Sequence, residues 1–393
     1  MRPGMQLLLA LLRGEARAED GSETEWETVL RLAEREKILP WTAAQLRLIS
    51  GAIAYGIDEQ LRKIRRDAQM AAFFWSSTLR SILAEFHDRE IAVVSLKGPW
   101  MAERLLGDAA LRSYSDLDLL VRPEDVARSE ELLFELGFRP RRCRDDHERP
   151  WYRDAVSVDL HHDVEHPLAW DFDVTRAWDR TCITPFQGVP VRLLAPADEL
   201  VFLCLHSTRH RFERLGHILD LTFAFQKLPL PWAGSYLVPN PEMARLVTFA
   251  SMMAARLDPR CRARRSADLS GRDHERLEQL ADQVWHERTT ESCPVTDWRA
   301  QHEFYLRMET RPLRRLLRRV RDVRILLTRL MEDDFVFAAR FHMRRPWQVW
   351  LLRPIRLLFH ASRAARSRSR PQQGGIGNYR SPEAVSFTGR TTG

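Results

Sequence analysis

Two long stretches of the chain carry apolar residues at helical spacing, and a shorter stretch with strand-like patterns separates them. Over residues 1–88 the spacing predicts helices, the longest of which runs from Glu59 to about His87. Helical spacing returns at residue 196 and continues to about residue 360. Between these regions, residues 89–195 hold short apolar runs that turn residues interrupt. The pattern predicts an α+β fold, with a small mixed sheet flanked by an N-terminal helical region and a C-terminal helical domain.

The same pattern divides the chain into four predicted parts. They are an N-terminal helical region (1–88), an α/β core (89–195), a C-terminal helical domain (196–366) and a tail (367–393). The tail consists mainly of Ser, Arg, Gly, Gln and Thr with few apolar residues, so we expect it to be disordered.

Composition narrows the class of protein without selecting a function. The chain has 393 residues, 44% hydrophobic and 29% charged, as is typical of globular proteins, and its net charge of +7 does not discriminate between partners. Five scattered cysteines without a C-x-x-C pair argue against a zinc knuckle and against a disulfide framework, which favours a cytoplasmic location. The apolar run Leu7–Leu12 stops at Arg13 and predicts an ordinary first helix rather than a secretion signal. No run approaches the roughly 20 apolar residues that a membrane span needs.

The stretch from Ile91 to Val121 alternates between strand patterns and closely spaced polar residues. Residues 91–94 form an apolar, β-branched run that predicts a buried strand, and Lys97-Gly98-Pro99 ends it. Residues 100–106 predict a short helix, and residues 112–115 predict a polar turn before a second strand.

The second strand, residues 116–121, places two carboxylates on one face. Successive side chains of a strand point to opposite faces, so Asp116 and Asp118 share one face while Leu117 and Leu119 point into a core. Neighbouring carboxylates repel each other and lose hydration unless a cation lies between them. A hard divalent ion with oxygen ligands resolves this conflict.

A third carboxylate is predicted on a neighbouring strand. Residues 151–164 resemble a hairpin that turns near Asp154-Ala155, and its second arm places Asp159 on the polar face. Together with Asp116 and Asp118, Asp159 would complete the set of carboxylates that two-metal phosphoryl-transfer sites use.

Several short motifs in this region resemble one family of enzymes. They are LKG at 96–98, RSYSDLDLLV at 112–121, LGF at 136–138 and VDLHHDV at 158–164. The order of strand, Lys-Gly, helix, Asp-x-Asp and a later Asp is similar to the nucleotidyltransferase superfamily that includes polymerase beta. The motifs themselves resemble its uncharacterised bacterial nucleotidyltransferases. The resemblance covers residues 90–165 well and the rest loosely.

The resemblance implies a nucleotidyltransferase-type sheet, an NTP donor and a metal-binding catalytic triad of Asp116, Asp118 and Asp159. Such an enzyme transfers an NMP from the NTP to an acceptor hydroxyl, with Mg²⁺ or Mn²⁺ as cofactor and pyrophosphate as leaving group. The predicted nucleotide-binding residues are Lys97, Gly98, Arg112 and Ser113. The acceptor stays open among a sugar, an antibiotic, a peptide, a protein and RNA, and the sequence does not select the base of the NTP.

One departure from the superfamily pattern keeps other functions open. Members usually have Gly-Ser after the first strand, whereas here Gly98 is followed by Pro99, which has neither an amide hydrogen nor a hydroxyl. A catalytically weak nucleotide-binding or adaptor module with the same fold is therefore an alternative. Arg-rich helices at 311–325 and 339–366 suggest a nucleic-acid binder as a third reading, although amphipathic packing helices explain the same pattern.

Histidines form a second group of candidates. His161 shares a strand face with Asp159 and is predicted to contact substrate or to support a metal ligand. His206 and Asp220 are predicted substrate contacts, in a helical region that also holds Arg209, His210 and His217. No H-E-x-x-H or comparable spacing of metal ligands is present, and helix-end histidines commonly have no specific role.

Overall fold

The computed structural model describes most of the first 309 residues. The described residues are 3–49, 55–141, 148–164, 172–229, 241–261, 269–290, 298–309 and 316. The chain forms one compact unit over residues 1–318 and a second unit over 319–393, and the second unit lies outside the described residues. The Arg-rich helices and the tail of the sequence analysis also lie outside them, apart from Leu316. The predicted domain boundaries stay predictions.

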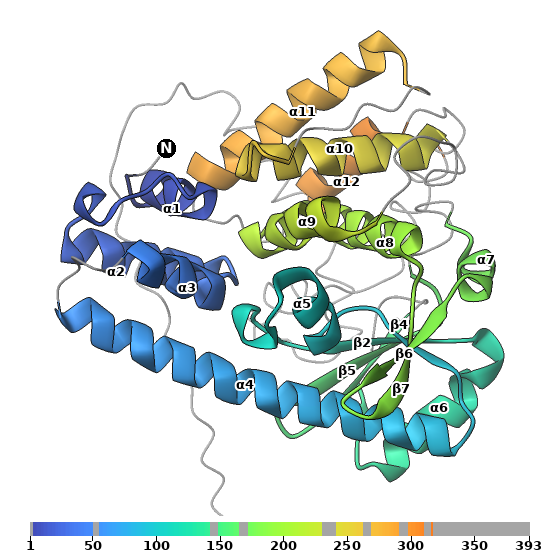
Figure 1. The fold of residues 1–393 in the computed structure, drawn as a ribbon. Helices are drawn as coiled ribbons and strands as arrows, with labels where there is room; N and C mark the ends of the chain where they lie inside the picture. Colours follow the sequence, from blue (N-terminus) through green and yellow to red (C-terminus); the bar gives the residue numbers. More distant parts are fainter. Residues whose placement is uncertain are drawn as a thin grey trace, which may run out of the picture. The chain divides into compact units, whose positions relative to one another are not determined.

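The N-terminal region is helical, as the apolar spacing predicts. Its helices are α1 (Pro3–Arg13), the short 3₁₀ helix η1 (Ala18–Asp20), α2 (Glu23–Arg35), α3 (Leu39–Ile49) and α4 (Tyr55–Asp88). A capping box starts α2, because the Ser22 hydroxyl accepts from the Glu25 backbone N–H and the Glu25 carboxylate accepts from the Ser22 N–H. The 34-residue α4 runs as one long rod along the lower side of the molecule in Figure 1.

A seven-stranded mixed sheet forms the centre of the described chain. Its strands are β1 (Val93–Ser95), β2 (Leu117–Val121), β3 (Arg139–Pro140), β4 (Glu148–Arg153), β5 (Val156–His161), β6 (Cys182–Phe186) and β7 (Val189–Leu193). The spatial order is β3-β4-β5-β2-β1-β7-β6. β2 is parallel to β5 and β1 is parallel to β7, whereas the other neighbouring pairs are antiparallel. The α+β fold class is confirmed.

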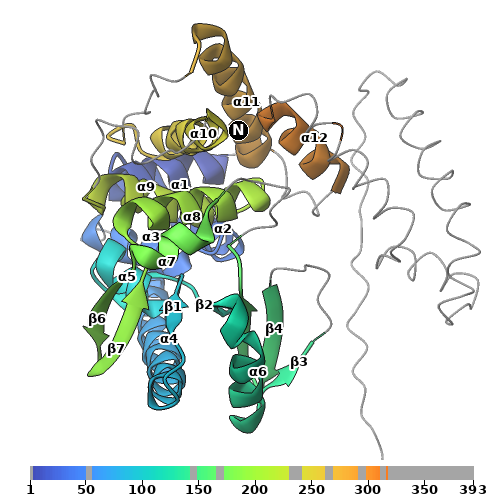
Figure 2. The same ribbon diagram turned by 90° about the vertical axis from the view of Figure 1, so that its right-hand side faces the viewer.

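Different helices cover the two faces of the sheet. On one face, α4 and α6 (Val126–Glu135) pack their apolar residues against Leu117 and Leu119 of β2. Residues of opposite parity, such as Leu120, belong to a second core together with α5 (Pro99–Leu106) and α8 (Pro196–Arg209). Figure 2 shows α8 and α9 (Leu215–Lys227) between the sheet and the later helices. Because Asp118 has the parity of Leu120, it points toward this second, helix-covered side.

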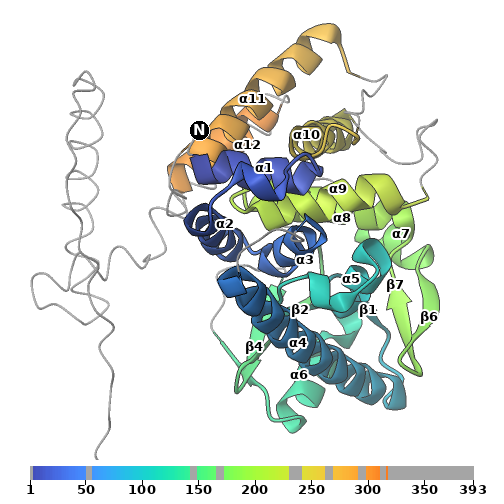
Figure 3. The same cartoon turned by 60° about the vertical axis from the view of Figure 1, so that its left-hand side comes forward.

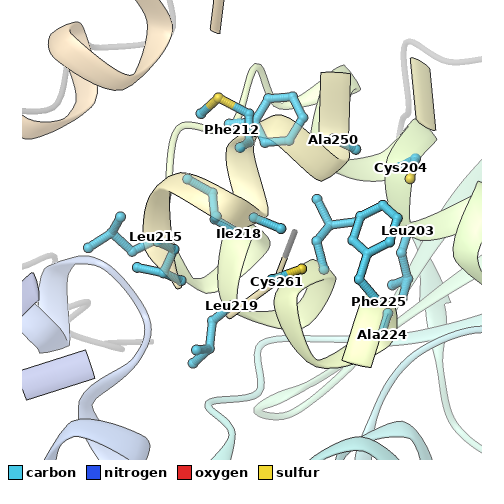
Figure 4. Packing of buried hydrophobic residues seen from close by; sticks show 14 of the residues in the cluster. Leu203, Cys204, Phe212, Leu215, Ile218, Leu219, Ala224, Phe225, Ala250 and Cys261 are labelled. Carbon is cyan, nitrogen blue, oxygen red and sulfur yellow. The ribbon is translucent and has the colours of Figure 1, made fainter. Parts of the chain in front are cut away.

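The C-terminal helices share one hydrophobic core with the N-terminal ones. Helices α10 (Pro241–Leu257), α11 (Gly271–Thr290) and α12 (Trp298–Met308) contribute to a buried cluster that also includes residues of α1, α2 and α3. Figure 3 shows these layers from the side of α1–α3, and Figure 4 shows the packing of Phe212, Ile218 and Phe225 within the cluster. None of the helices among the described residues is long and apolar enough to cross a membrane.

Several local details differ from the sequence analysis. The strand β6 falls in a segment without a predicted strand, because its side chains are mostly exposed and its apolar pattern is weak. β3 is short, with two residues, and lies at one edge of the sheet. Asp116 lies immediately before β2 rather than within it. The remaining short elements are the 3₁₀ helices η3 (Ala109–Leu111) and η4 (Pro123–Asp125) and the helix α7 (Val174–Asp179).

Candidate active site

Strand register brings two of the three predicted carboxylates side by side. Asp118 of β2 is the direct partner of Asp159 on the parallel strand β5, so both side chains point to the same face. The hairpin that positions Asp159 turns at Asp154, at the position predicted from the sequence. Asp154 has a φ of 51°. Asp116 lies two residues before Asp118 and is close enough to influence the pKa of Asp159.

Cationic and imidazole groups surround the Asp118 carboxylate. The Lys97 ammonium lies 3.1 Å from Asp118 Oδ2, and the two side chains are only 6% and 5% exposed. His161 Nε2 lies 3.1 Å from Asp118 Oδ1. Asp118 Oδ1 therefore has a hydrogen-bond partner in His161, whereas Oδ2 forms an ion pair with Lys97.

The contacts of Asp118 extend in both directions through buried groups. On one side, His161 Nδ1 is 3.5 Å from Glu148 Oε2, which is 2.9 Å from the Arg209 guanidinium of α8. On the other side, the Lys97 ammonium lies 3.1 Å and 3.3 Å from the two ring nitrogens of His206. We call these six residues, from Arg209 through Asp118 to His206, the acidic-face network.

The carboxyl groups of this face have opposite shifts in pKa. Burial alone would raise the pKa of Asp118, but the charge of Lys97 and the hydrogen bond from His161 hold it well below its usual range. Asp159 has no such partner set: burial, and then the negative charges of Asp118 and Asp116, raise its pKa to about 7. The negative charges of Asp116 and Asp118 therefore disfavour the ionised form of Asp159.

The donor set of this face suits a hard divalent ion only in part. Carboxylate oxygens from Asp116, Asp118 and Asp159 are the ligand type that Mg²⁺ and Mn²⁺ prefer, and the raised pKa of Asp159 indicates a shortage of positive charge there. Among the described residues, however, no three His, Cys, Asp or Glu side chains stand ready to hold an ion, and Lys97 already neutralises Asp118. An ion at this position therefore requires Lys97 to release Asp118.

The predicted Lys-Gly break has a definite backbone reason. Gly98 is the N-cap of α5 and has a φ of 116°, a conformation that L-residues with a side chain rarely adopt. Pro99 occupies the first helical position, where its missing N–H removes no helical hydrogen bond. The pair thus ends β1 and starts α5 within two residues, and this tight turn positions Lys97 over the sheet face.

A cavity of about 220 Å³ adjoins the network. Six of the predicted site residues line it: Lys97, Arg112, Ser113, Asp116, His206 and Asp220. Asp118, Asp159 and His161 lie on the adjacent sheet face, and Gly98 is at the start of α5. Lys97 both lines the cavity and pairs with Asp118, so it links the carboxylates to the cavity.

Arg112 is the best-fixed cation of the cavity. Its guanidinium makes three contacts of 3.1–3.3 Å with the Asp220 carboxylate of α9. Burial alone would lower the pKa of Arg112, but Asp220 raises it, so the guanidinium stays charged. Asp220 is therefore a positioning residue for Arg112.

Three histidines also line the cavity. His206 lies in the last turn of α8, His210 is the C-cap residue of that helix, and His217 lies on α9. The ring centroids are 4.7 Å apart for His206 and His210, 5.4 Å for His206 and His217, and 5.1 Å for His210 and His217. We call these three residues the histidine cluster.

Comparison with known proteins assigns the chain to a family. A family model described as uncharacterised nucleotidyltransferase matches residues 22–257, which is more than half of the chain and includes the acidic-face network and the histidine cluster. The chain belongs to this nucleotidyltransferase family. The resemblance noted in the sequence is thereby confirmed, and the match extends well beyond residues 90–165 into the helices on both sides.

Solved structures give a more distant likeness to this nucleotidyltransferase. The antibiotic-resistance factor ANT(2'')-Ia, also crystallised in complex with adenylyl-2''-tobramycin, is 16% identical, with a TM-score of 0.32 over 47% of this chain and 91–97% of the other. An antigenic nucleotidyltransferase-like protein from Paracoccidioides brasiliensis is 16% identical, with a TM-score of 0.35 over 49% of this chain and 94% of the other. At these TM-scores the likeness indicates neither a shared substrate nor a shared activity. A search of curated proteins finds no match.

Some residues of the site gave no signal in the sequence of this nucleotidyltransferase. Glu148 reaches the network only because its strand pairs with that of His161, which no local motif indicates. Lys37 and Arg214 line the cavity from segments far apart in the chain. Arg209, His210 and His217 were weaker candidates, and the four-residue spacing of His206 and His210 was the available sign that they share a helix face.

Proposed function

We propose that this protein is a metal-dependent nucleotidyltransferase that transfers an NMP from an NTP to an acceptor hydroxyl, with pyrophosphate leaving. The observation that carries the proposal is the in-register pair of Asp118 and Asp159 beside a cavity with several basic residues. Membership of the chain in the family supports the transfer reaction, while the metal and the hydroxyl acceptor are our inference from the carboxylates.

Phosphate binding falls to the cavity side of the site. Arg112 is held by Asp220 with its charge retained, and a fixed guanidinium suits the oxygens of a phosphate group. Ser113 adds a hydroxyl donor beside it, and Lys97 is placed to leave Asp118 for a bound phosphate. These contacts replace the Gly-Ser loop that Pro99 removes.

The sheet face would supply the metal ligands and the proton acceptor. Asp116, Asp118 and Asp159 would hold Mg²⁺ or Mn²⁺, which when bound neutralises phosphate charge and lowers the pKa of an acceptor hydroxyl. Asp159, in register with Asp118 on the neighbouring strand, is the residue that we assign to receive the hydroxyl proton. Buried His161 keeps Asp118 oriented through its Nε2 contact.

The test compares two aspartates of one hairpin. With radiolabelled NTP, Mg²⁺ and a cell extract as the source of acceptor, Asp159→Asn should lower transfer of label by about 10²–10⁴-fold, the range for loss of a general base. The matched control is Asp154→Asn at the exposed tip of the same hairpin, where Asn tolerates the positive φ. Equal transfer by Asp159→Asn and the control would contradict the mechanism.

A nucleotide-binding module without efficient transfer is the second candidate. Two observations favour it: Pro99 stands where the superfamily has Ser, and Lys97 neutralises the central carboxylate. In the same experiment, tight binding of labelled NTP without label on any acceptor would support the module. The nucleic-acid alternative concerns helices outside the described residues and stays a prediction.

A further inference from the structure

The histidine cluster lies in the most cationic part of the described site. The groups facing His206 are Lys97, Arg209 and the other two rings, and those facing His217 are Lys97, Arg112, Arg214 and His210. An acidic group is also close, because Glu213 Oε1 lies 3.6 Å from His210 Nδ1. Lys37, Asp116 and Asp220 also line the cavity, and Asp220 is already paired with Arg112.

These surroundings disfavour a proton on His206 and on His217 in the free protein. Burial, and then the positive charges of Lys97, His210 and His217, lower the pKa of His206 well below its ordinary value. Burial and the charges of His210, Lys97 and Arg112 do the same for His217. Three imidazoles within about 5 Å of one another also repel a second proton once the first has bound.

We propose that the cavity beside the histidine cluster binds the phosphate groups of the nucleotide and that the cluster takes up a proton from solvent as they bind. The inference rests on the proposed function, and adds to it a role for His206, His210 and His217. The proton goes to an imidazole nitrogen, and no bond of the nucleotide is made or broken in this step.

The negative charge of phosphate would favour the protonated form of these imidazole rings over the neutral form. A neutral imidazole presents a lone pair on one nitrogen, which a phosphate oxygen disfavours, whereas an imidazolium donates from both nitrogens. Multiple negative charges within a few ångströms stabilise the protonated ring, as opposite charges do in general. His217 Nδ1 is buried and makes no hydrogen bond among the described residues, so a donor at this position lacks an acceptor until a ligand brings one.

A transition metal is the competing ligand for three histidines, and the geometry argues against it. The Lys97 ammonium lies 3.1–3.3 Å from both nitrogens of His206, and its charge would repel a metal ion at this ring. The facing arginines would repel a second cation, and no group of three ligands among the described residues is arranged to hold an ion. A bound anion has the opposite effect, because it offsets these charges.

The experiment measures proton uptake directly. Inorganic triphosphate is titrated into the full-length protein by calorimetry at pH 7.5, in buffers with low and high heats of ionisation. We expect net uptake of about one proton per triphosphate bound, relative to His206→Asn and His217→Asn variants in which most of that uptake is lost. Because protonation of triphosphate itself is the same in every titration, it cancels in this difference. The control His87→Asn, an exposed histidine at the end of α4, should match the parent protein.

A second measurement avoids dependence on the stability of the variants. At pH 7.5, addition of inorganic triphosphate to the parent protein should shift the NMR signals of one histidine ring from the positions of a neutral ring to those of a protonated ring. Equal proton uptake in the parent and in both cluster variants would overturn the proposal, as would unshifted ring signals at saturation. Tight binding of Zn²⁺ that is lost in the same variants would overturn it too, in favour of a metal site.

These outcomes separate the inference from the proposed function. Inorganic triphosphate requires no acceptor and no transfer, so coupled proton uptake can be present in a protein that transfers nothing. Conversely, label transfer with no uptake would retain the enzyme and remove the role of the histidine cluster.

Discussion

The acidic-face network and the histidine cluster share His206, which contacts Lys97, but they differ in how their charges are balanced. In the network, the central Asp118 forms an ion pair with Lys97 and contacts the His161 ring. In the cluster, His206 and His217 face mainly cationic groups, and Glu213 lies 3.6 Å from His210. We expect the first arrangement to contribute to the stability of the free protein, and we propose that the second favours an anionic ligand. On this hypothesis, buried charge serves stability in one region and binding in the other.

Breaking the Lys97–Asp118 pair should have the largest effect on stability. The pair is almost fully buried, so Lys97→Met leaves the Asp118 charge uncompensated and should lower the free energy of unfolding by about 3–5 kcal/mol. Removing both charges, in Lys97→Met/Asp118→Leu, should recover most of this loss. Urea denaturation measures both values.

The control for this comparison is an exposed pair on α4. Arg62 and Asp58 are one turn apart and Arg62 is 62% exposed, so Arg62→Met should cost about 0–0.5 kcal/mol. A double variant no more stable than Lys97→Met would show that packing, not charge, is what Lys97 contributes. If Asp118 also binds a divalent ion, Mg²⁺ should restore part of the stability that Lys97→Met loses, and should restore none in the double variant.

Asp159 should give the next largest effect, through the pH dependence of stability. Its pKa of about 7 in the folded protein is above the unfolded value of about 3.9, so the folded state binds more protons between these values. The stabilisation is complete below about pH 4 and is lost as the pH rises to about 7. The free energy of unfolding should fall by roughly 2–4 kcal/mol more in the parent than in Asp159→Asn over this range, measured in EDTA.

The parent protein has to be compared with Asp159→Asn because other groups change the stability with pH in the opposite direction. The pKa of Asp118 is lowered, so its stabilisation is lost as pH falls below about 4, and the lowered pKa values of His206 and His217 cost stability as pH falls below about 6.5. Curves for the parent and Asp159→Asn that stay parallel from pH 4 to pH 7 would show that Asp159 is not perturbed in solution.

The sequence predicted the parts of the site that local pattern controls. Alternation along residues 116–121 and 156–161 indicated that Asp118 and Asp159 each lie on the polar face of their own strand, because side-chain direction on a strand has a period of two. The Lys-Gly-Pro break indicated the end of β1, because Gly98 needs a positive φ. Those features depend on residues within a few positions of each other.

The charge balance of the site could not be predicted in the same way. The contact of Lys97 with Asp118 depends on the antiparallel pairing of β1 and β2, and that of Glu148 with His161 depends on the register of β4 and β5. The cavity joins Lys37, Arg112 and Arg214 from segments whose packing follows from the shared helical core. Such long-range pairings are set by tertiary packing, which a single sequence read by local pattern does not specify.

The smallest change in stability is expected at the cavity rim, and it tests the comparison most sharply. Lys37 is exposed, lines the cavity and already has a φ of 62°, so Lys37→Met replaces one side chain by another of similar length without new backbone strain. The free energy of unfolding should change by less than about 0.5 kcal/mol, as for surface substitutions in general. The Kd for inorganic triphosphate should nevertheless rise by about three- to tenfold, because one positive charge near the bound phosphates is lost. Loss of stability without weaker binding would place Lys37 with the acidic-face network and would show that the two regions are not separated by function.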